Sequence, residues 1–259
     1  METIENIVLV GAGNVATHLG KALQQNGKKV VQVYSRTAKS ARQLADAINS
    51  DYTTEMKMIY PGADLYIFSV SDDALQGLLA EFPHKDSLVA HTSGSQPMKI
   101  ITEAGLKAAV LYPLQTFSKN VTVDFANIPI CIEADTQPNA IRLHDLASSI
   151  SNDIRFVNSD QREAIHVAAV FSCNFVNHLF TIADEILQTH DISFDILHPL
   201  IEETVRKAMQ NQPSAVQTGP AARKDHRIIS KHINKLSSLP DYRKIYTFMS
   251  ESIMKNAKK

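Results

Sequence analysis

The sequence predicts an α/β fold with a doubly wound parallel sheet, followed by an all-helical C-terminal domain. Two observations support this prediction. Short apolar runs alternate with helix-like segments from the start of the chain to about residue 157, and no strand-like run follows that point. We therefore expect a sheet domain over residues 1–158 and a helical domain over residues 159–259.

Seven short apolar runs, many of them rich in β-branched residues, are the expected strands. Continuous apolar runs between helices are typical of strands that are buried on both faces of a mostly parallel sheet. The runs are residues 6–10, 30–34, 65–70, 88–91, 108–112, 128–132 and 154–157.

The last hundred residues predict helices only. One helix of nearly 30 residues is expected to end at about Gln188, because no Gly or Pro occurs between Asp160 and Pro199. Asp160 and Glu163 have the spacing of a helix-capping pair. Further helices are expected at about 193–211, with a bend at Pro199, and at 220–237 and 241–256.

The composition excludes several classes of protein. The chain has 259 residues, is 44% hydrophobic and 20% charged, and carries a net charge of -1, so a main role in binding nucleic acid is not expected. Its two cysteines, Cys131 and Cys173, form no CxxC pair, and neither a disulfide scaffold nor a metal site is predicted. The N-terminal segment is a poor secretory signal, and no unbroken apolar run approaches the ~20 residues of a membrane span. We expect a cytoplasmic protein.

A glycine-rich turn follows the first strand and begins the first helix. Gly11 allows a tight turn, Gly13 allows close approach of the backbone, and Ala16 allows the helix to pack on the strand. A pyrophosphate would bind at the helix N-terminus. These residues predict a Rossmann dinucleotide site, and the alternative is a purely structural turn. The other residues of the expected cofactor-binding turn are Ala12, Asn14 and Val15.

The end of the second strand indicates which dinucleotide binds. Ser35, Arg36 and Thr37 stand where an NAD site usually has an Asp or Glu that holds the ribose hydroxyls. Hydroxyl groups beside a guanidinium suit the 2′-phosphate of NADP, so NADP is the expected cofactor. The alternative for Arg36 is an exposed loop cation.

Two later strand ends are expected to face the cofactor, since ligands of open parallel sheets bind beyond the carboxyl ends of the strands. One is Val70 with Ser71, and the other is Ser93 with Gly94. Ser93 and Gly94 offer hydroxyl and backbone donors to a nicotinamide or substrate oxygen. The alternative is a capped turn that leads into a helix at 97–105. His91 is expected to end a buried strand with its ring satisfied.

Three polar side chains interrupt the long apolar helix. On a regular α-helix Asn177 lies about 20° and Asn174 about 80° around from His166, so all three project broadly to one side. Such a polar stripe is either a satisfied structural network or one wall of an active site. In the second case His166 is the general acid and the asparagines orient the substrate.

The segment TGPAARKD contains Thr218 and places Gly219 and Pro220 at the expected start of a helix, with Arg223 in its first turns. Backbone donors and a guanidinium are suited to binding a carboxylate. The alternative is a helix start with solvated charges.

Several motifs together resemble a known family. GAGNVA, SRT, HTSGS, YPLQTFS, IHVAAVFSCNFVNHLF and QTGPAARKD are similar to the motifs of a family of Rossmann-like NADP oxidoreductases whose C-terminal helical domain has no known function. The resemblance spans nearly the whole chain and places it in the 6-phosphogluconate dehydrogenase-like superfamily, with ketopantoate reductase, pyrroline-5-carboxylate reductase, prephenate dehydrogenase and the 3-hydroxyacid dehydrogenases.

The resemblance also implies roles for single residues. Asn174 stands where ketopantoate reductase has an asparagine, and His166 stands where that enzyme and the 3-hydroxyacid dehydrogenases have a catalytic lysine. Tyr112 and Pro113 are similar to a His-Pro pair of prephenate dehydrogenase. Relatives of this kind are commonly dimers joined through the helical domain, which implies a homodimer here.

The residues and the resemblance together predict an NADP(H)-dependent oxidoreductase. It would move hydride between the nicotinamide and the carbonyl or imine carbon of a small carboxylic acid, with a 2-oxo acid such as ketopantoate as the first expectation and a cyclic imine acid as the second. The alternative is a non-catalytic NADP(H)-binding sensor or scaffold protein.

Overall fold

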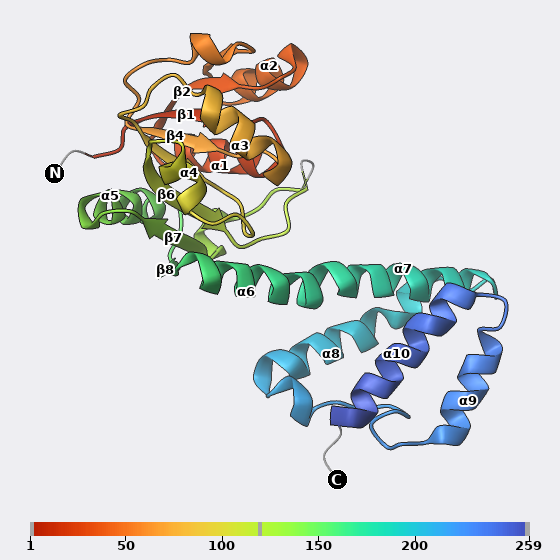
Figure 1. Cartoon of the computed structure of the whole chain (residues 1–259). Coiled ribbons are helices and arrows are strands. Elements are labelled where there is room, and N and C mark those ends of the chain that lie inside the picture. The colour runs from red at the N-terminus through yellow and green to blue at the C-terminus, as the bar shows by residue number, and fades with distance from the viewer. Residues whose placement is uncertain (1–2, 119–120, 257–259) are drawn as a thin grey trace. The chain divides into compact units, whose positions relative to one another are not determined.

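The computed structural model describes residues 3–118 and 121–256, which form parts of two compact units (Figure 1). The first unit is Met1–Cys173 and the second is Asn174–Lys259. The predicted domain division at 158/159 stays a prediction, and it falls within the first compact unit, at the start of helix α6 (Ser159–Ala169). This helix is attached to the sheet by the buried side chain of Arg162 and belongs to the first unit.

The described part of the first unit contains one eight-stranded sheet. All seven expected strands are confirmed, with ends that differ by at most two residues. The additional strand, β3, was not predicted because it has three residues, two of them exposed. The strands are β1 (Asn6–Val10), β2 (Lys29–Tyr34), β3 (Asp51–Thr53), β4 (Leu65–Phe68), β5 (Leu88–His91), β6 (Lys107–Pro113), β7 (Ile130–Ala134) and β8 (Ile154–Phe156).

The strand order is β3-β2-β1-β4-β5-β6-β7-β8, and the pairs from β3 to β6 are parallel. β7 runs antiparallel to β6, and β8 runs parallel to β7. The order reverses between β1 and β4, which is the point where doubly wound sheets bind their ligands. The predicted fold class is confirmed.

Helices cover both faces of this sheet and bury two hydrophobic cores. Residues of α1 (Asn14–Gln25), α2 (Ala38–Ala47) and α5 (Gln137–Ser148) contribute to one core. Residues of α3 (Asp72–Glu81) and α4 (Lys99–Glu103) contribute to the other. With both faces buried, the carboxyl edge of the sheet is left to bind ligands.

The long helix is confirmed as one run over Ser159–Gln188. It consists of α6, a π-helical segment Val170–Asn174 and α7 (Phe175–Gln188). Its cap is a capping box of Asn158 and Gln161, so the predicted Asp160–Glu163 pair is wrong: the helix begins earlier, and Asp160 lies in its first turn. The prediction that His166, Asn174 and Asn177 project to one side of the helix assumed 3.6 residues per turn. The π-helical segment between His166 and Asn177 has a wider turn, so the angles calculated for a regular α-helix do not apply.

The second unit contains three further α-helices among its described residues. They are α8 (His198–Gln210), which follows a 3₁₀ turn at Phe194–Leu197, α9 (His226–Lys235) and α10 (Pro240–Asn256). α9 begins later than predicted because Asp225 caps it, its carboxylate accepting the backbone N–H of Ile228. The expected helix start at Gly219 and Pro220 is therefore wrong, and these residues form turns.

The helix Ser159–Gln188 is long and apolar enough to cross a membrane, by length and composition alone. Its 18-residue window has a mean hydropathy of 1.4, and 6% of that window is buried. Counting unbroken apolar runs along the sequence overlooks such a helix, because single His, Asn and Ser residues interrupt it. The same composition occurs in helices that are covered by protein.

Candidate active site

The phosphate-binding turn is fixed by its first glycine. Gly11 has φ = 123°, and a Cβ atom there would lie 2.1 Å from the carbonyl oxygen of Ser69. Its backbone N–H donates to the carbonyl of Tyr34 at 2.8 Å. The turn is thus held between the ends of β2 and β4, and Val70 lies against it, with Cγ1 3.2 Å from the same Cβ position.

The second glycine leaves room for a ligand. A Cβ atom on Gly13 would meet nothing within 4 Å, and no described side chain caps the N-terminus of α1 at this residue. The backbone N–H groups of Asn14, Val15 and Ala16 open the helix, and an uncapped helix N-terminus favours an anion. The turn therefore fits the pyrophosphate of a dinucleotide.

The side chain of Asn14 holds a loop that is distant in the sequence. Its side-chain amide donates to the carbonyl of Phe117 at 2.8 Å, and its backbone N–H takes no part in this bond. Phe117 also stacks on His18, and His18 Nε2 lies 3.0 Å from the carbonyl of Ser118. Residues 114–118, which we call the strap, thus connect the end of β6 to the first turns of α1.

The end of β2 presents a cation and two hydroxyl groups. Arg36 and Thr37 are exposed, Ser35 is half-buried, and Arg36 makes no ion pair with a described residue. No carboxylate stands among these three residues. The guanidinium is available for the 2′-phosphate of NADP, as the sequence predicts.

The ends of β4 and β5 are joined by hydrogen bonds. The hydroxyl of Thr92 donates to that of Ser69 at 3.2 Å. The hydroxyl of Ser95 donates to the carboxylate of Asp72, the residue after Ser71. The predicted residues Ser71, Ser93 and Gly94 therefore lie in connected loops at one edge of the sheet.

Ser93 has the structural role that the sequence left open. Its hydroxyl oxygen accepts the backbone N–H groups of Ser95 at 3.2 Å and Gln96 at 3.0 Å, as in a capped turn. Its own backbone N–H donates to Nδ1 of His91 at 3.2 Å. His91 is fully buried, as expected, and burial together with the charge of Arg162 lowers its pKa to about 4. Its ring is only half satisfied, because Nε2 bonds to no described residue.

His166 lies directly against the loop after β5. A Cβ atom on Gly94 would be 2.7 Å from both Cγ and Nδ1 of the His166 ring, so only glycine fits there. The hydroxyl of Tyr112 lies 3.2 Å from the same Nδ1 atom, and burial raises the pKa of this tyrosine. A hydroxyl donates or accepts, so it satisfies Nδ1 of the neutral or the protonated ring. His166 Nε2 makes no hydrogen bond with a described residue.

Tyr112 is the residue that reasoning from chemistry along the sequence missed. The sequence indicates it only through the resemblance of the Tyr112-Pro113 pair to a His-Pro pair of prephenate dehydrogenase, and this resemblance implies no role for it here. Its signal was its position at the end of a strand beside the one that carries Ser93 and Gly94, since neighbouring parallel strands end at one edge.

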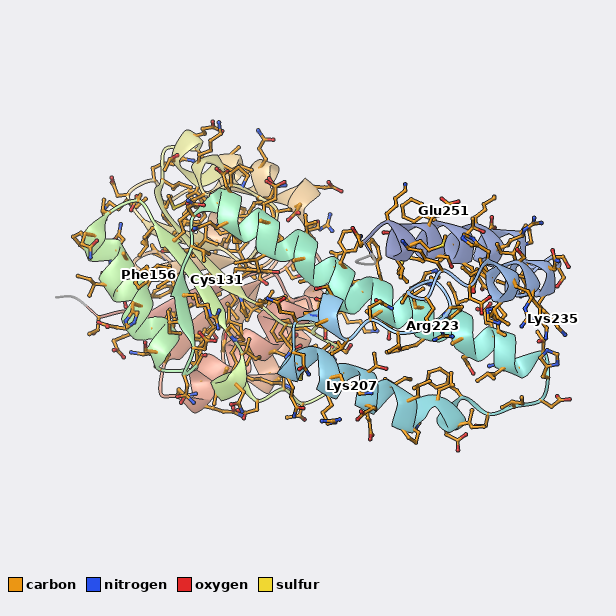
Figure 2. All side chains as sticks on the ribbon, turned by 90° about the horizontal axis from the view of Figure 1, so that it is seen from below. Cys131, Phe156, Lys207, Arg223, Lys235 and Glu251 are labelled. Atoms are coloured by element: carbon orange, nitrogen blue, oxygen red, sulfur yellow. The ribbon has the colours of Figure 1, made fainter. Side chains whose placement is uncertain are left out.

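Four predicted residues belong to the second unit. Asn174, Asn177, Thr218 and Arg223 are all exposed. Arg223, labelled in Figure 2, lies in the turn before α9 and not in its first turns, and it makes no ion pair with a described residue. The roles of these four residues in substrate binding remain predictions.

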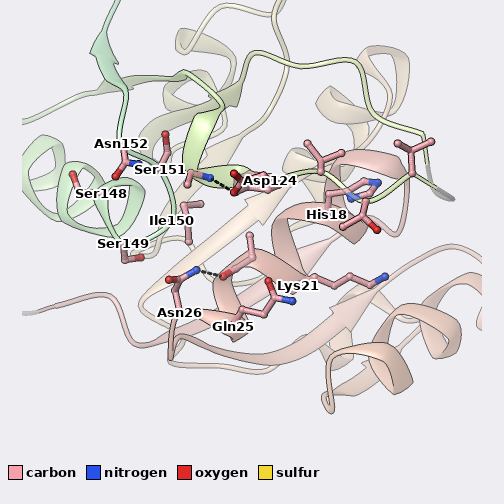
Figure 3. Close-up of a pocket in the computed structure, with 16 residues that line it drawn as sticks. His18, Lys21, Gln25, Asn26, Asp124, Ser148, Ser149, Ile150, Ser151 and Asn152 are labelled. Carbon is pink, nitrogen blue, oxygen red and sulfur yellow. Dashed lines mark hydrogen bonds between the residues drawn. The ribbon is translucent and has the colours of Figure 1, made fainter.

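A polar cavity of about 570 Å³ lies elsewhere in the first unit (Figure 3). Lys21 and Gln25 of α1, Asp124 and the segment 148–152 line it, and none of the predicted site residues does. Among the described residues no group of three or more His, Cys, Asp or Glu is placed to hold a metal ion.

Two family models match the chain. The model described as "NADP oxidoreductase coenzyme F420-dependent" matches residues 6–93, and a domain of unknown function, DUF2520, matches residues 128–253. The first match contains the phosphate turn and ends at Ser93, and the second contains Glu133 and the long helix. A comparison with curated proteins gave no match.

Solved structures support the same family. A candidate NADP oxidoreductase from Bacteroides fragilis is 43% identical, with a TM-score of 0.89, over 97% of this chain and 98% of that one. A reductive aminase from Aspergillus terreus, in complex with NADPH and ethyl levulinate, is 13% identical with a TM-score of 0.64 over 90% and 78%. A pyrroline-5-carboxylate reductase from Coxiella burnetii is 16% identical with a TM-score of 0.60 over 99% and 100%. The last two show a shared fold alone.

Proposed function

Because this chain belongs to the NADP oxidoreductase family that joins a dinucleotide-binding domain to a helical domain of unknown function, we propose that it reduces or oxidises a small carboxylic acid. Hydride would pass between the nicotinamide and a carbonyl or imine carbon. The observation that carries this proposal is the Tyr112–His166 pair beside Gly94, at the same sheet edge as the phosphate turn.

The cofactor, when bound, supplies the hydride at C4 of its nicotinamide. The chain supplies the binding groups. The backbone N–H groups that open α1 would hold the pyrophosphate, and the guanidinium of Arg36 with the hydroxyls of Ser35 and Thr37 would hold the 2′-phosphate.

His166 would move the proton of the reaction. In the direction of reduction the protonated ring donates from Nε2 to the carbonyl oxygen or imine nitrogen, while the carbon gains hydride, and an alcohol or amine results. Nδ1–H then remains on the neutral ring, donating to the Tyr112 hydroxyl. A histidine suits this step because its ordinary pKa of about 6.5 lies near neutrality.

Two substrate classes remain in the proposal. A 2-oxo acid is the first and a cyclic imine acid the second; the names of the pyrroline-5-carboxylate reductase and reductive aminase structures support the second. Arg223 is the proposed partner of the carboxylate, since its guanidinium is exposed. Asn174, Asn177 and Thr218 are proposed to orient the substrate.

The test begins with cofactor binding. Thermal unfolding of the protein is followed with NADPH, with NADH and with neither, since a ligand of the folded state raises the midpoint. NADPH oxidation is then followed with a panel of 2-oxo acids and cyclic imine acids. The proposal is supported if acids of one class oxidise NADPH in the presence of the wild-type protein and the His166→Gln variant abolishes this oxidation. NADPH binding without oxidation of either class would contradict it and favour the binding-only alternative.

We further propose that the protein works in the cytoplasm as a homodimer. The second unit exposes several large apolar side chains on and just before one short helix, and an exposed apolar patch is a common site of protein association. On and just before α8 these are Ile192, Ile196, Leu200, Val205 and Met209, the last 83% exposed. Sedimentation of the wild type and of Met209→Lys tests the homodimer. A wild-type dimer that the variant weakens supports a second copy of the chain as the partner of this apolar surface. A monomeric wild type, or wild type that pellets with lipid vesicles, contradicts the homodimer.

A further inference from the structure

We propose that Arg162 is a positioning residue that sets the place of the His166 ring through a buried clamp with Glu133 and the Gln96 backbone. This inference rests on the proposed function only in that His166 is taken as the proton donor. The placement itself is a property of the first unit.

The guanidinium of Arg162 joins three segments of the chain. Its side chain is 1% exposed. Nη1 donates to the carboxylate of Glu133 on β7, and Nη2 donates to the carbonyl of Gln96 at 2.6 Å. A planar guanidinium with donors in fixed directions is suited to such a role, and an ammonium group is not.

Glu133 also holds the start of the helix. Its carboxylate accepts the backbone N–H of Ser159 at 3.2 Å and the Ser159 hydroxyl at 2.9 Å. The same hydroxyl oxygen accepts the backbone N–H of Met98 at 3.0 Å. The first turns of α6 are therefore fastened both to β7 and to the segment that follows Gly94.

The register of the sheet then determines where His166 lies. Glu133 is paired with Val110 across the β6–β7 ladder, and Cys131 is paired with Tyr112, two residues further along β6. Two residues of strand span about 6.6 Å, and four residues of helix span about 6 Å. These two spans match the observed contacts: Arg162 bonds to Glu133, and His166, four positions later on the same side of α6, bonds to Tyr112.

The position of the His166 ring has to be accurate, because the ring packs tightly against its neighbours. The ring approaches Gly94 so closely that one added carbon atom would overlap it, and it also bonds to Tyr112. Catalytic groups have to be held to within about 0.5 Å of their working position. Arg162 fixes both sides of this contact, because it holds the helix and also the Gln96 carbonyl just after Gly94.

The alternative is that the clamp only stabilises the fold. A buried ion pair is weak evidence for stability, since apolar residues of the same volume often stabilise as well or better. The two roles differ in what they do to the His166 ring: a merely stabilising pair leaves the ring unchanged as long as the protein stays folded.

The experiment reads the ring directly, without a substrate. Nitrogen-15 NMR of the imidazole groups is recorded for the wild type, Arg162→Lys and Glu133→Gln, with His166→Gln to assign the signal among the ten histidines. Glu5→Gln is the matched control, because it changes a Glu–Lys pair at 2.9 Å in the same unit without touching α6. Thermal shift with NADPH verifies folding of each variant.

We expect Arg162→Lys and Glu133→Gln to lose the Nδ1 signature of the Tyr112 bond while NADPH still binds, and Glu5→Gln to match the wild type. With an active substrate, kcat falls at least 10-fold in both variants and the NADPH dissociation constant changes less than threefold. If Arg162→Lys does not fold, the test rests on Glu133→Gln, because this substitution keeps the shape of the side chain. An unchanged His166 signal in folded Glu133→Gln overturns the inference. Full activity of His166→Gln overturns the proposed function instead and leaves the NMR result standing.

Discussion

The hydroxyl oxygen of Tyr112 lies 3.2 Å from Nδ1 of His166, although 54 residues separate them in the chain. Their rings meet edge to face, with centroids 6.2 Å apart. One residue comes from the end of a central strand, and the other comes from a helix that begins after the sheet is complete. This pair connects the carboxyl edge of the sheet to the helix that carries the proposed proton donor.

Removing either member of this pair should slow turnover and leave cofactor binding intact. Because general acid catalysis contributes about 10²- to 10⁴-fold, we expect His166→Gln to lower kcat at least 100-fold. Tyr112→Phe removes only the hydrogen bond to Nδ1, so a loss of about 10-fold is expected. Steady-state kinetics with NADPH binding measured in parallel checks both. A Tyr112→Phe protein as active as the wild type would show that the hydrogen bond to Nδ1 has no catalytic role, and a His166→Gln protein as active as the wild type would remove the histidine from the mechanism.

A methyl group on Gly94 should displace the His166 ring. The added carbon would lie 2.7 Å from ring atoms, so Gly94→Ala is expected to lower kcat at least 10-fold and to cost about 1–3 kcal/mol of stability. The matched control is Gly77→Ala in α3, where the added carbon meets nothing within 4 Å. That helical substitution should stabilise by about 0.5–1 kcal/mol. Urea unfolding and kinetics of both variants make the comparison, and equal effects would refute the contact.

A methyl group on Gly13 should separate cofactor binding from folding. The position is open, so Gly13→Ala is expected to keep the unfolding midpoint of the free protein. The same carbon would stand where the backbone has to approach a pyrophosphate, and the NADPH dissociation constant should rise at least 10-fold. Calorimetric titration measures the affinity. Unchanged affinity would mean that the cofactor does not use this turn.

Arg36 should decide between the two nicotinamide cofactors. Arg36→Asp replaces a guanidinium suited to the 2′-phosphate with a carboxylate that repels it. We expect NADPH affinity to fall at least 10-fold, with NADH affinity changed much less. The measurement is the ratio of the two dissociation constants in wild type and variant. Equal losses for both cofactors would remove Arg36 from the 2′-phosphate site.

Burial of His91 should make the fold sensitive to acid. Its pKa is lowered to about 4 in the folded protein, against about 6.5 when unfolded, so between these values the unfolded state binds more protons. Stability is therefore lost as the pH falls from about 6.5 towards 4, with a contribution of about 2 kcal/mol lost by pH 5. Urea unfolding at pH 7 and pH 5 tests this against His91→Asn, which keeps an acceptor for the Ser93 N–H. The variant should lose about 2 kcal/mol less than the wild type over this range, and identical losses would contradict the assignment.

The sequence predicted those parts of the protein that depend on neighbours within one turn or one strand. Short apolar runs separated by helices indicated the parallel sheet. Gly11 and Gly13 between a strand and a helix indicated the phosphate turn, because the backbone conformation at Gly11 excludes a side chain and the absence of one at Gly13 leaves room for a ligand. The absence of Gly and Pro after Asp160 indicated the long helix. Three-residue strand β3 and the π turn have no such local signal.

Tertiary structure alone decided how the site is assembled. The contacts of Tyr112 with His166, of Arg162 with Glu133 and of Asn14 with Phe117 join residues 54, 29 and 103 positions apart. Their distances depend on which residues pair across β6 and β7 and on where the first turn of α6 is fastened. A pattern along the chain supplies the residue types, but the register between distant segments is set only when both faces of the sheet pack.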